Sequence, residues 1–223
     1  MRPIKTTLAG FALALACGFA QAGVITLNGD HFSVSYDEAL VDPLYKTALL
    51  SGSQDTVYFL PTKFAALTGG APVSTQAALH FTLAIDPGYS FAGIEFAESG
   101  SYFLSKGGSV GAGASLQATN SDTLAAVVLN LASPALGAVG TSTPWSLAAL
   151  LGPGGLDAPH TLAISFDNTL HSEPSSGIGF IQSTYVGFRV LTLPPAQSVP
   201  EPSGLALLVG GALAALAVRR RRL

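Results

Sequence analysis

A period-two alternation of apolar and polar residues runs through the middle of the chain and restricts the fold more than any other feature. Residues 79–85 alternate in this way, and Asp86-Pro87-Gly88 ends the run with turn-forming residues. Residues 24–27 and 32–36 flank Asn28-Gly29, a pair typical of β-hairpins. Because Asp30 follows this pair, we expect a hairpin loop longer than two residues. The pattern therefore predicts an all-β fold.

The rest of the central region carries further strand patterns and two segments of less regular pattern. We expect strands at 91–96, 102–104, 162–166 and 185–193, and weaker ones at 56–60 and 114–118. Thr143-Pro144-Trp145 followed by residues 146–151 and Gly152 predicts a two-turn helix, because it combines an N-cap, an early proline and a glycine stop. Residues 122–131 fit a strand or a helix. Together these predict a single β-sandwich-like ectodomain over residues 23–193, with one or two short helices.

The charge distribution excludes two classes of protein. The chain has 223 residues, of which 48% are apolar and 10% are charged, so it is too hydrophobic for a disordered polyelectrolyte. Residues 23–193 hold four basic and twelve acidic residues, a net charge of −8. Nucleic-acid binding requires a basic surface, so we expect no nucleic-acid partner.

The N-terminus has the pattern of a secretory signal peptide over residues 1–22. Arg2 and Lys5 precede an apolar run, and Ala20-Gln21-Ala22 offers the small side chains that signal peptidase recognises, with Gly23 as the first mature residue. Lipoprotein processing at Cys17, the only cysteine of the chain, is the alternative. Signal-peptidase cleavage would remove Cys17 and leave a mature chain without thiols or disulfides, suited to an oxidising compartment.

The C-terminus combines a linker, an apolar run and a basic cluster. Residues 194–202 form the linker and contain Pro200, Glu201 and Pro202, whose prolines favour an extended peptide. Residues 203–218 are apolar, and a helix of this length spans ~24 Å, somewhat short of the ~30 Å hydrocarbon core. Arg219, Arg220, Arg221 and Arg222 follow as a cytoplasmic basic stop. We therefore expect residues 203–223 to hold a short transmembrane helix and its basic end.

Pro-Glu-Pro, a short apolar helix and an arginine cluster, in this order, resemble the PEP-CTERM sorting signal. The resemblance covers about the last 24 residues. It implies recognition by an exosortase, an integral-membrane cysteine-dependent processing enzyme. It also implies export in a Gram-negative bacterium that makes exopolysaccharide. In this interpretation Pro200, Glu201 and Pro202 are substrate features and carry out no catalysis.

Two residue patterns are candidate catalytic centres. Gly107-Gly108-Ser109-Val110-Gly111 matches the G-x-S-x-G nucleophile elbow, but the glycine-rich residues after it favour a β–β loop over the helix that an elbow requires. Glu95 and Glu98 flank a strand end and are candidates for a glycosidase carboxylate pair.

The histidines, the acidic residues and the aromatic residues are candidates for metal or sugar sites. His31 and His160 are expected at strand starts, His80 on a polar strand face and His171 in a loop, none at metal-ligand spacing. Acids gather at Asp37, Glu38, Asp42 and Asp55, as a calcium site or a solvated acidic loop. Exposed aromatic rings can stack on sugars, and the candidates are Trp145, Tyr36, Tyr45, Tyr58, Tyr89, Tyr102 and Tyr185.

These observations predict an exported protein with no catalytic, cofactor or metal site. We expect it to be anchored in the membrane in transit, processed by an exosortase-like enzyme, and then placed at the cell surface or in the extracellular matrix. There it would have a structural or adhesive role associated with exopolysaccharide. A carbohydrate-binding module and a secreted hydrolase are the two alternatives. The hydrolase requires several of the acids or histidines to converge in one cleft.

Overall fold

The computed structural model describes residues 23–195, which fold into two stacked β-sheets. The first sheet contains β1 (Val24–Asn28), β2 (Phe32–Asp37), β6 (Val73–Ile85), β8 (Gly108–Asn120), β9 (Ala126–Ala132) and β11 (Thr161–Pro174). The second contains β3 (Leu49–Leu50), β4 (Thr56–Phe59), β5 (Ala65–Thr68), β7 (Ser90–Leu104), β10 (Thr143–Leu151) and β12 (Gly179–Leu193). The all-β, sandwich-like fold predicted from the alternation is confirmed.

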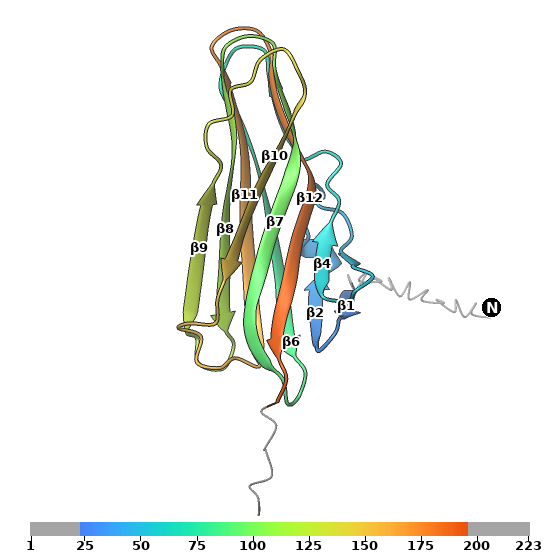
Figure 1. The fold of residues 1–223 in the computed structure, drawn as a ribbon. Helices are drawn as coiled ribbons and strands as arrows, with labels where there is room; N and C mark the ends of the chain where they lie inside the picture. The colour runs from blue at the N-terminus through green and yellow to red at the C-terminus, as the bar shows by residue number, and fades with distance from the viewer. Residues whose placement is uncertain (1–22, 196–223) are drawn as a thin grey trace, which may run out of the picture.

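The strand order places the long strands at the centre of an elongated sandwich (Figure 1). The first sheet runs β1-β2-β6-β11-β8-β9 and the second runs β10-β7-β12-β4-β3, with β5 also paired to β12. All pairings are antiparallel. In Figure 1, β9 and β10 lie on one lateral side, whereas β1, β2 and β4 lie on the other. The strand β12 ends at Leu193, at the lower end of the sandwich in this view.

The predicted N-terminal hairpin is confirmed. The strands β1 and β2 pair from Val24 opposite Asp37 to Asn28 opposite Ser33, with residues 29–31 as the loop. Within this loop the Gly29 amide donates a 2.8 Å hydrogen bond to the Phe32 carbonyl, and His31 has a φ of 70°. The loop is therefore one residue longer than a two-residue turn, as the following Asp30 suggested.

The core lies between the sheets and is rich in aromatic rings. Phe166 of β11 has its ring centroid 5.0 Å from Phe96 of β7 and 5.1 Å from Phe188 of β12. Tyr45, from the segment before β3, approaches the same ring at 6.3 Å. All four side chains are at most 1% exposed. Aromatic contacts of this kind add about 0.5–1.5 kcal/mol each beyond their area burial, so this group joins both sheets.

The helix predicted at Thr143–Leu151 is wrong, because this segment forms the edge strand β10. Its side chains alternate, with Trp145, Leu147 and Leu151 buried while Pro144, Ser146, Ala148 and Leu150 are exposed. Pairing with β7 from Thr143 opposite Tyr102 to Leu151 opposite Ile94 supplies its hydrogen bonds. The alanine and leucine residues favour a helix only weakly, and burial of alternate residues against the other sheet outweighs that preference.

The other predictions of local structure have mixed outcomes. Of residues 122–131, the later part lies in β9, so the strand alternative is the correct one. Within residues 23–195 the helical content is a single 3-10 turn at Glu38–Leu40, which the sequence did not predict. The separate strands expected at 91–96 and 102–104 form one continuous strand, β7. The weaker strand at 56–60 corresponds to β4, which ends one residue earlier, and the one at 114–118 lies within β8.

Candidate functional site

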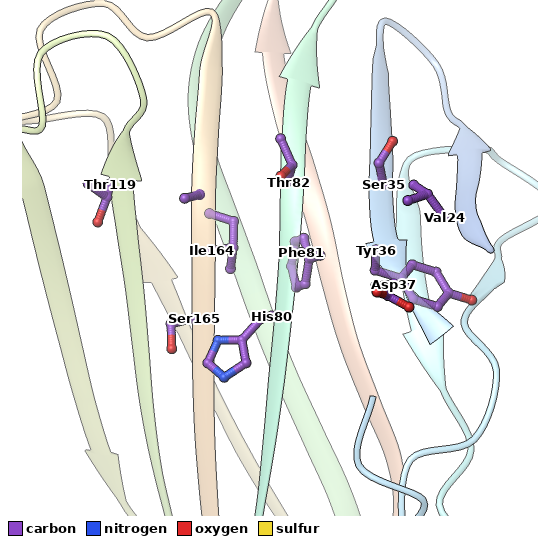
Figure 2. Close-up of a pocket in the computed structure, with 11 residues that line it drawn as sticks. Val24, Ser35, Tyr36, Asp37, His80, Phe81, Thr82, Thr119, Ile164 and Ser165 are labelled. Carbon is purple, nitrogen blue, oxygen red and sulfur yellow. The ribbon is translucent and has the colours of Figure 1, made fainter. Parts of the chain in front are cut away.

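A shallow groove on the outer face of the first sheet is the first candidate site (Figure 2). Its volume is ≈ 390 Å³. His80 of β6 lies opposite Ser165 of β11, and Thr82 of β6 lies opposite Ser35 of β2. The lining contains hydroxyls, one imidazole and one carboxylate but no lysine or arginine, so it offers hydrogen bonds to a neutral polar ligand. The lining residues are Val24, Ser35, Tyr36, Asp37, His80, Phe81, Thr82, Thr119, Ala163, Ile164 and Ser165.

A polar cluster inside the core is the second candidate. Glu98 of β7 and Asn168 of β11 are each 1% exposed, and Asn168 Nδ2 donates a 2.7 Å hydrogen bond to Glu98 Oε1. Burial raises the pKa of Glu98 to about 7, although Asn168 and Ser183 of β12 counteract part of that rise. Burial also raises the pKa of Tyr45 well above its ordinary value. Because these groups are enclosed between the sheets, their arrangement suits a structural role better than contact with a substrate.

Two tyrosines and an arginine on the outer face of the second sheet form the third candidate. Tyr58 of β4 and Tyr185 of β12 have ring centroids 5.8 Å apart and planes that differ by 23°. The hydroxyl end of Tyr185 lies over Gly187, since a Cβ added to that glycine would collide with it. The Tyr185 side chain therefore lies along β12 and occupies the space that a side chain at position 187 would fill.

Arg189 of β12 lies two residues further along the same face. Its Nε donates to Asp55 Oδ2 at 2.9 Å, and its Nη1 donates to Glu95 Oε2 at 3.1 Å. Hydrogen bonds from Ser53, Thr56, Arg189 and Ser51 hold the pKa of Asp55 well below its usual range. The side chain of Arg189 is 51% exposed, so the ion pairs are accessible to solvent. We call Tyr58, Tyr185, Arg189, Asp55 and Glu95 the tyrosine face.

The predicted carboxylate pair is not brought together. Glu95 is exposed on the outer face of β7, whereas Glu98 is buried on the inner face of the same strand. Positions three apart on a strand point to opposite faces of the sheet, and this geometry separates the two carboxyl groups. Continuing the alternation from Ile94 and Phe96 would have placed Glu98 in the core. The pairing of Glu98 with Asn168 was missed, because only the stacking of the sheets brings β7 over β11.

The G-x-S-x-G motif lies at the start of a strand. Gly108 to Gly111 belong to β8 and pair with β11, with Ser109 opposite Glu173. The expected β–β loop is therefore wrong beyond Gly107, and a strand rather than a helix follows the serine. Gly108 has a φ of 123°, and its Cα hydrogen faces the backbone of Pro174, where a Cβ would collide. The glycines thus permit close strand pairing.

The four histidines lie apart. His31 is in the hairpin loop, where it stacks on Tyr89 at 3.7 Å and contacts Asp30 at 3.2 Å. His160 directly precedes β11, and His80 is exposed on β6, as expected. His171 lies within β11 and covers Gly111 of β8, so its predicted loop position is wrong. Pairing along all of β11 makes this strand longer than the local pattern indicated.

The predicted acidic cluster is divided among local turns. Asp37 Oδ1 accepts a hydrogen bond from the Ala39 amide, and Asp42 Oδ1 accepts one from the Leu44 amide. Asp55 belongs to the tyrosine face, and Glu38 lies in the 3-10 turn. Residues 23–195 contain no group of three or more histidine, cysteine or acidic side chains arranged to hold a metal ion.

Of the aromatic candidates, three are partly exposed: Tyr58, Tyr89 and Tyr185. The other four, Tyr36, Tyr45, Tyr102 and Trp145, are buried. Hydrogen bonds hold three of the buried ones: Tyr36 Oη accepts from the Ala48 amide, Tyr102 Oη accepts from the Ala138 amide, and Trp145 Nε1 donates to the Gln182 carbonyl.

The predicted terminal sites lie mainly outside the described residues. These are Cys17, Ala20 and Ala22 at the N-terminus, and Pro200, Glu201, Pro202 and Arg219 to Arg222 at the C-terminus. Gly23 is described and is exposed. Residues 203–218, the predicted membrane helix, are also outside. In the described part of the chain, no helix is long and apolar enough to cross a membrane.

Comparisons with known proteins give distant structural likenesses. No family model and no curated protein matches the chain. A structure of infectious bursal disease virus, Gx strain, matches 74% of this chain at 13% identity and a TM-score of 0.29. A T13 particle of the same virus matches 73% at 10% identity and a TM-score of 0.28. This chain spans 39% and 46% of those two chains.

A third similar structure is TmCBM61 in complex with β-1,4-galactotriose. It matches 71% of this chain and 88% of its own length, at 12% identity and a TM-score of 0.21. Identities and TM-scores this low assign neither a family nor a function. The sites described above are therefore the basis for a functional proposal, together with the sequence of the two termini.

Proposed function

We propose that this protein is exported, sorted and processed through its C-terminal tail, and then serves a non-catalytic structural or adhesive role in an exopolysaccharide layer. The observation that carries the proposal is the order of Pro200-Glu201-Pro202, the apolar residues 203–218 and Arg219 to Arg222. An exosortase-like membrane enzyme is the partner that such a tail requires, and signal peptidase is the partner at Ala22. The arginines and the signal peptide specify the same orientation, with residues 23–193 outside the cytoplasm.

The placement of the catalytic candidates supports a non-catalytic role. Glu95 and Glu98 point to opposite faces of β7, and Ser109 is paired within a strand. The four histidines belong to separate local environments. A hydrolase would need several such groups around one cleft, as general acid–base or nucleophilic catalysis requires.

Intact mass spectrometry tests the proposal directly. The full-length gene is expressed in a Gram-negative host that carries an exosortase, and in a matched host whose exosortase is deleted. We expect a chain that begins at Gly23 in both hosts, and loss of Arg219 to Arg222 only where the exosortase is present. Pro200→Ala with Pro202→Ala is expected to retain the arginines in both hosts. Retention of the arginines by the unaltered chain in the exosortase host would overturn the proposal.

The tyrosine face favours carbohydrate binding as a second candidate function. Tyr58 and Tyr185 present near-parallel rings, and aromatic faces pack against the apolar faces of sugar rings. Arg189, Asp55 and Glu95 place charged donors and acceptors beside them, which suits hydrogen bonding to sugar hydroxyls. This face would supply the adhesive contact with exopolysaccharide.

Affinity electrophoresis through gels that contain the host exopolysaccharide tests this second function. We expect the polysaccharide to retard the chain, and Tyr58→Ala or Tyr185→Ala to reduce the retardation by at least half. Tyr89→Ala is the matched control, because Tyr89 is also partly exposed but stacks on His31 and is not one of the two stacked rings of the tyrosine face. Equal retardation of all three variants would exclude this face as the binding surface.

A further inference from the structure

The strand β9, from Ala126 to Ala132, forms one end of the first sheet. It pairs with β8, and no other described strand pairs with it. Figure 1 shows it along the lateral boundary of the sandwich, beside β8. An edge strand of this kind exposes a row of unpaired N–H and C=O groups, which can pair with another chain.

The hydrogen-bond pattern identifies which residues of β9 carry the free groups. The Asn120 amide donates to the Ala125 carbonyl, and the Ser133 amide donates to the Ala112 carbonyl, each at 2.8 Å. Hydrogen-bonded and non-hydrogen-bonded positions alternate along an antiparallel pair. The odd-numbered residues of β9 therefore bond to β8, and the even-numbered residues direct their N–H and C=O groups away from the sheet. These residues are Ala126, Val128, Asn130 and Ala132, and their side chains are all exposed.

Charge is nearly absent from this side of the molecule. Between Lys106 and Asp157 the only charged residue is Asp122, and this interval contains the whole of β8, β9 and β10. Natural edge strands are commonly protected by charged side chains, by proline or by being very short. Here β3 has two residues and β10 carries Pro144. Of the two edge strands of the first sheet, which both lack charge and proline, β9 with seven residues is longer than β1 with five.

The partner that best fits this edge is a second copy of the same chain. Residues 23–193 carry a net charge of −8, so two copies repel each other through most of their surfaces. Contact along β9 brings uncharged residues together, where that repulsion is weakest. A two-fold symmetric contact is also self-complementary, because a residue that contacts a second residue of the partner is matched by the same contact in the reverse sense.

We propose that β9 is a self-association edge, at which two copies join their first sheets through an antiparallel β9–β9 pair centred on Leu129. In this register Val128 of each copy lies opposite Asn130 of the other, and Ala126 lies opposite Ala132. All the outward N–H and C=O groups named above are then paired. The result is a continuous sheet across two molecules. This inference extends the structural role proposed above, but it is argued from the edge strand and not from the C-terminal tail.

Sedimentation velocity of the full-length chain in detergent, produced in a host without exosortase, tests this inference. We expect a monomer–dimer equilibrium. Val128→Glu should weaken dimerisation several-fold, because it places like charges diagonally across the two-fold axis. Thr82→Glu adds the same charge on an exposed position of the central strand β6 and should leave dimerisation unchanged. A circular dichroism melt verifies that each variant is folded.

A charge-swap variant tests the register. Val128→Glu combined with Asn130→Lys places opposite charges across both symmetric pairs. The double variant should therefore restore the dimerisation that Val128→Glu weakens. A monomeric unaltered chain, or equal dimerisation of Val128→Glu and Thr82→Glu, would overturn the proposal. Failure of the charge swap to restore the dimer would reject the Leu129-centred pairing. None of these results depends on cleavage of the tail. Intact mass spectrometry tests the sorting proposal separately, so a failure of one proposal can be told apart from a failure of the other.

Discussion

Asn168 Nδ2 on β11 donates a 2.7 Å hydrogen bond to Glu98 Oε1 on β7, and this bond joins the two sheets inside the core. The carboxyl group has lost nearly all of its water and has gained one strong hydrogen bond in exchange. A buried carboxyl in this environment favours the neutral form, which raises its pKa to about 7.

The raised pKa of Glu98 predicts that the folded protein is more stable in mild acid than above neutral pH. The folded state holds its proton more tightly than the unfolded chain, whose carboxyl titrates near 4.5. This stabilisation is complete below about pH 4.5 and is lost as the pH rises through about 7. The group alone contributes about 3 kcal/mol to the change in unfolding free energy.

Urea unfolding between pH 4 and pH 8 measures this effect. Glu98→Gln should remove most of the loss of stability toward pH 8, because the amide cannot ionise. Glu95→Gln, on the exposed face of the same strand, should keep the pH dependence of the unaltered chain. A pH dependence that is identical in Glu98→Gln and in the unaltered chain would contradict the assignment.

Phe166 is predicted to be among the most sensitive positions of the core. Its ring contacts Phe96 and Phe188, and a cavity between the sheets would remain after truncation. Phe166→Ala should lower the free energy of unfolding by about 3–5 kcal/mol. Chemical denaturation measures the change, and Phe103→Ala, at a partly exposed position on the outer face of β7, should have a clearly smaller effect.

Gly100 is predicted to be intolerant of any side chain. A Cβ at this position would collide with the Gln182 carbonyl, which also accepts a 3.0 Å hydrogen bond from Trp145 Nε1. Gly100→Ala should destabilise the protein by about 1–3 kcal/mol, since β7 and β12 must move apart. Gly69→Ala is the control, because no atom lies within 4 Å of its added Cβ. Equal melting temperatures for the two variants would refute the close approach at Gly100.

Asp55 is predicted to make the protein sensitive to strong acid. Its lowered pKa stabilises the folded state above the unfolded value of about 3.8, and this contribution is lost as the pH falls below that value. Because the site is partly exposed, the contribution is at most about 1 kcal/mol and should weaken with salt. Between pH 4 and pH 2, the free energy of unfolding of Asp55→Asn should depend less steeply on pH than that of the unaltered chain. Glu173→Gln, at an exposed position of β11, should keep the steeper dependence.

Local patterns in the sequence were sufficient for much of the fold. The hairpin at Asn28-Gly29 and the alternation at residues 79–85 depend on turn chemistry and side-chain period, which act between near neighbours. Thr143–Leu151 shows where such reasoning fails. Its N-cap, proline and glycine fit a helix, but pairing with β7 and burial of Trp145 and Leu147 require a strand. The strand that pairs with this segment lies 41 to 57 positions earlier in the chain, beyond the reach of a local pattern.

The sequence by itself determined the all-β class and the acidic character of residues 23–193, because both depend on residue types and on the spacing of near neighbours. It is also the sole basis for the proposed sorting role of the C-terminal tail. Only the tertiary structure decided which residues meet across the sandwich. Glu98 meets Asn168 through the stacking of two sheets, and Tyr58 meets Tyr185 through the pairing of β4 with β12. The interval after Lys106, in which Asp122 is the only charged residue before Asp157, is visible in the sequence, but the strand order places its strand β9 at a lateral edge. Contacts between distant segments depend on topology, which no local pattern specifies.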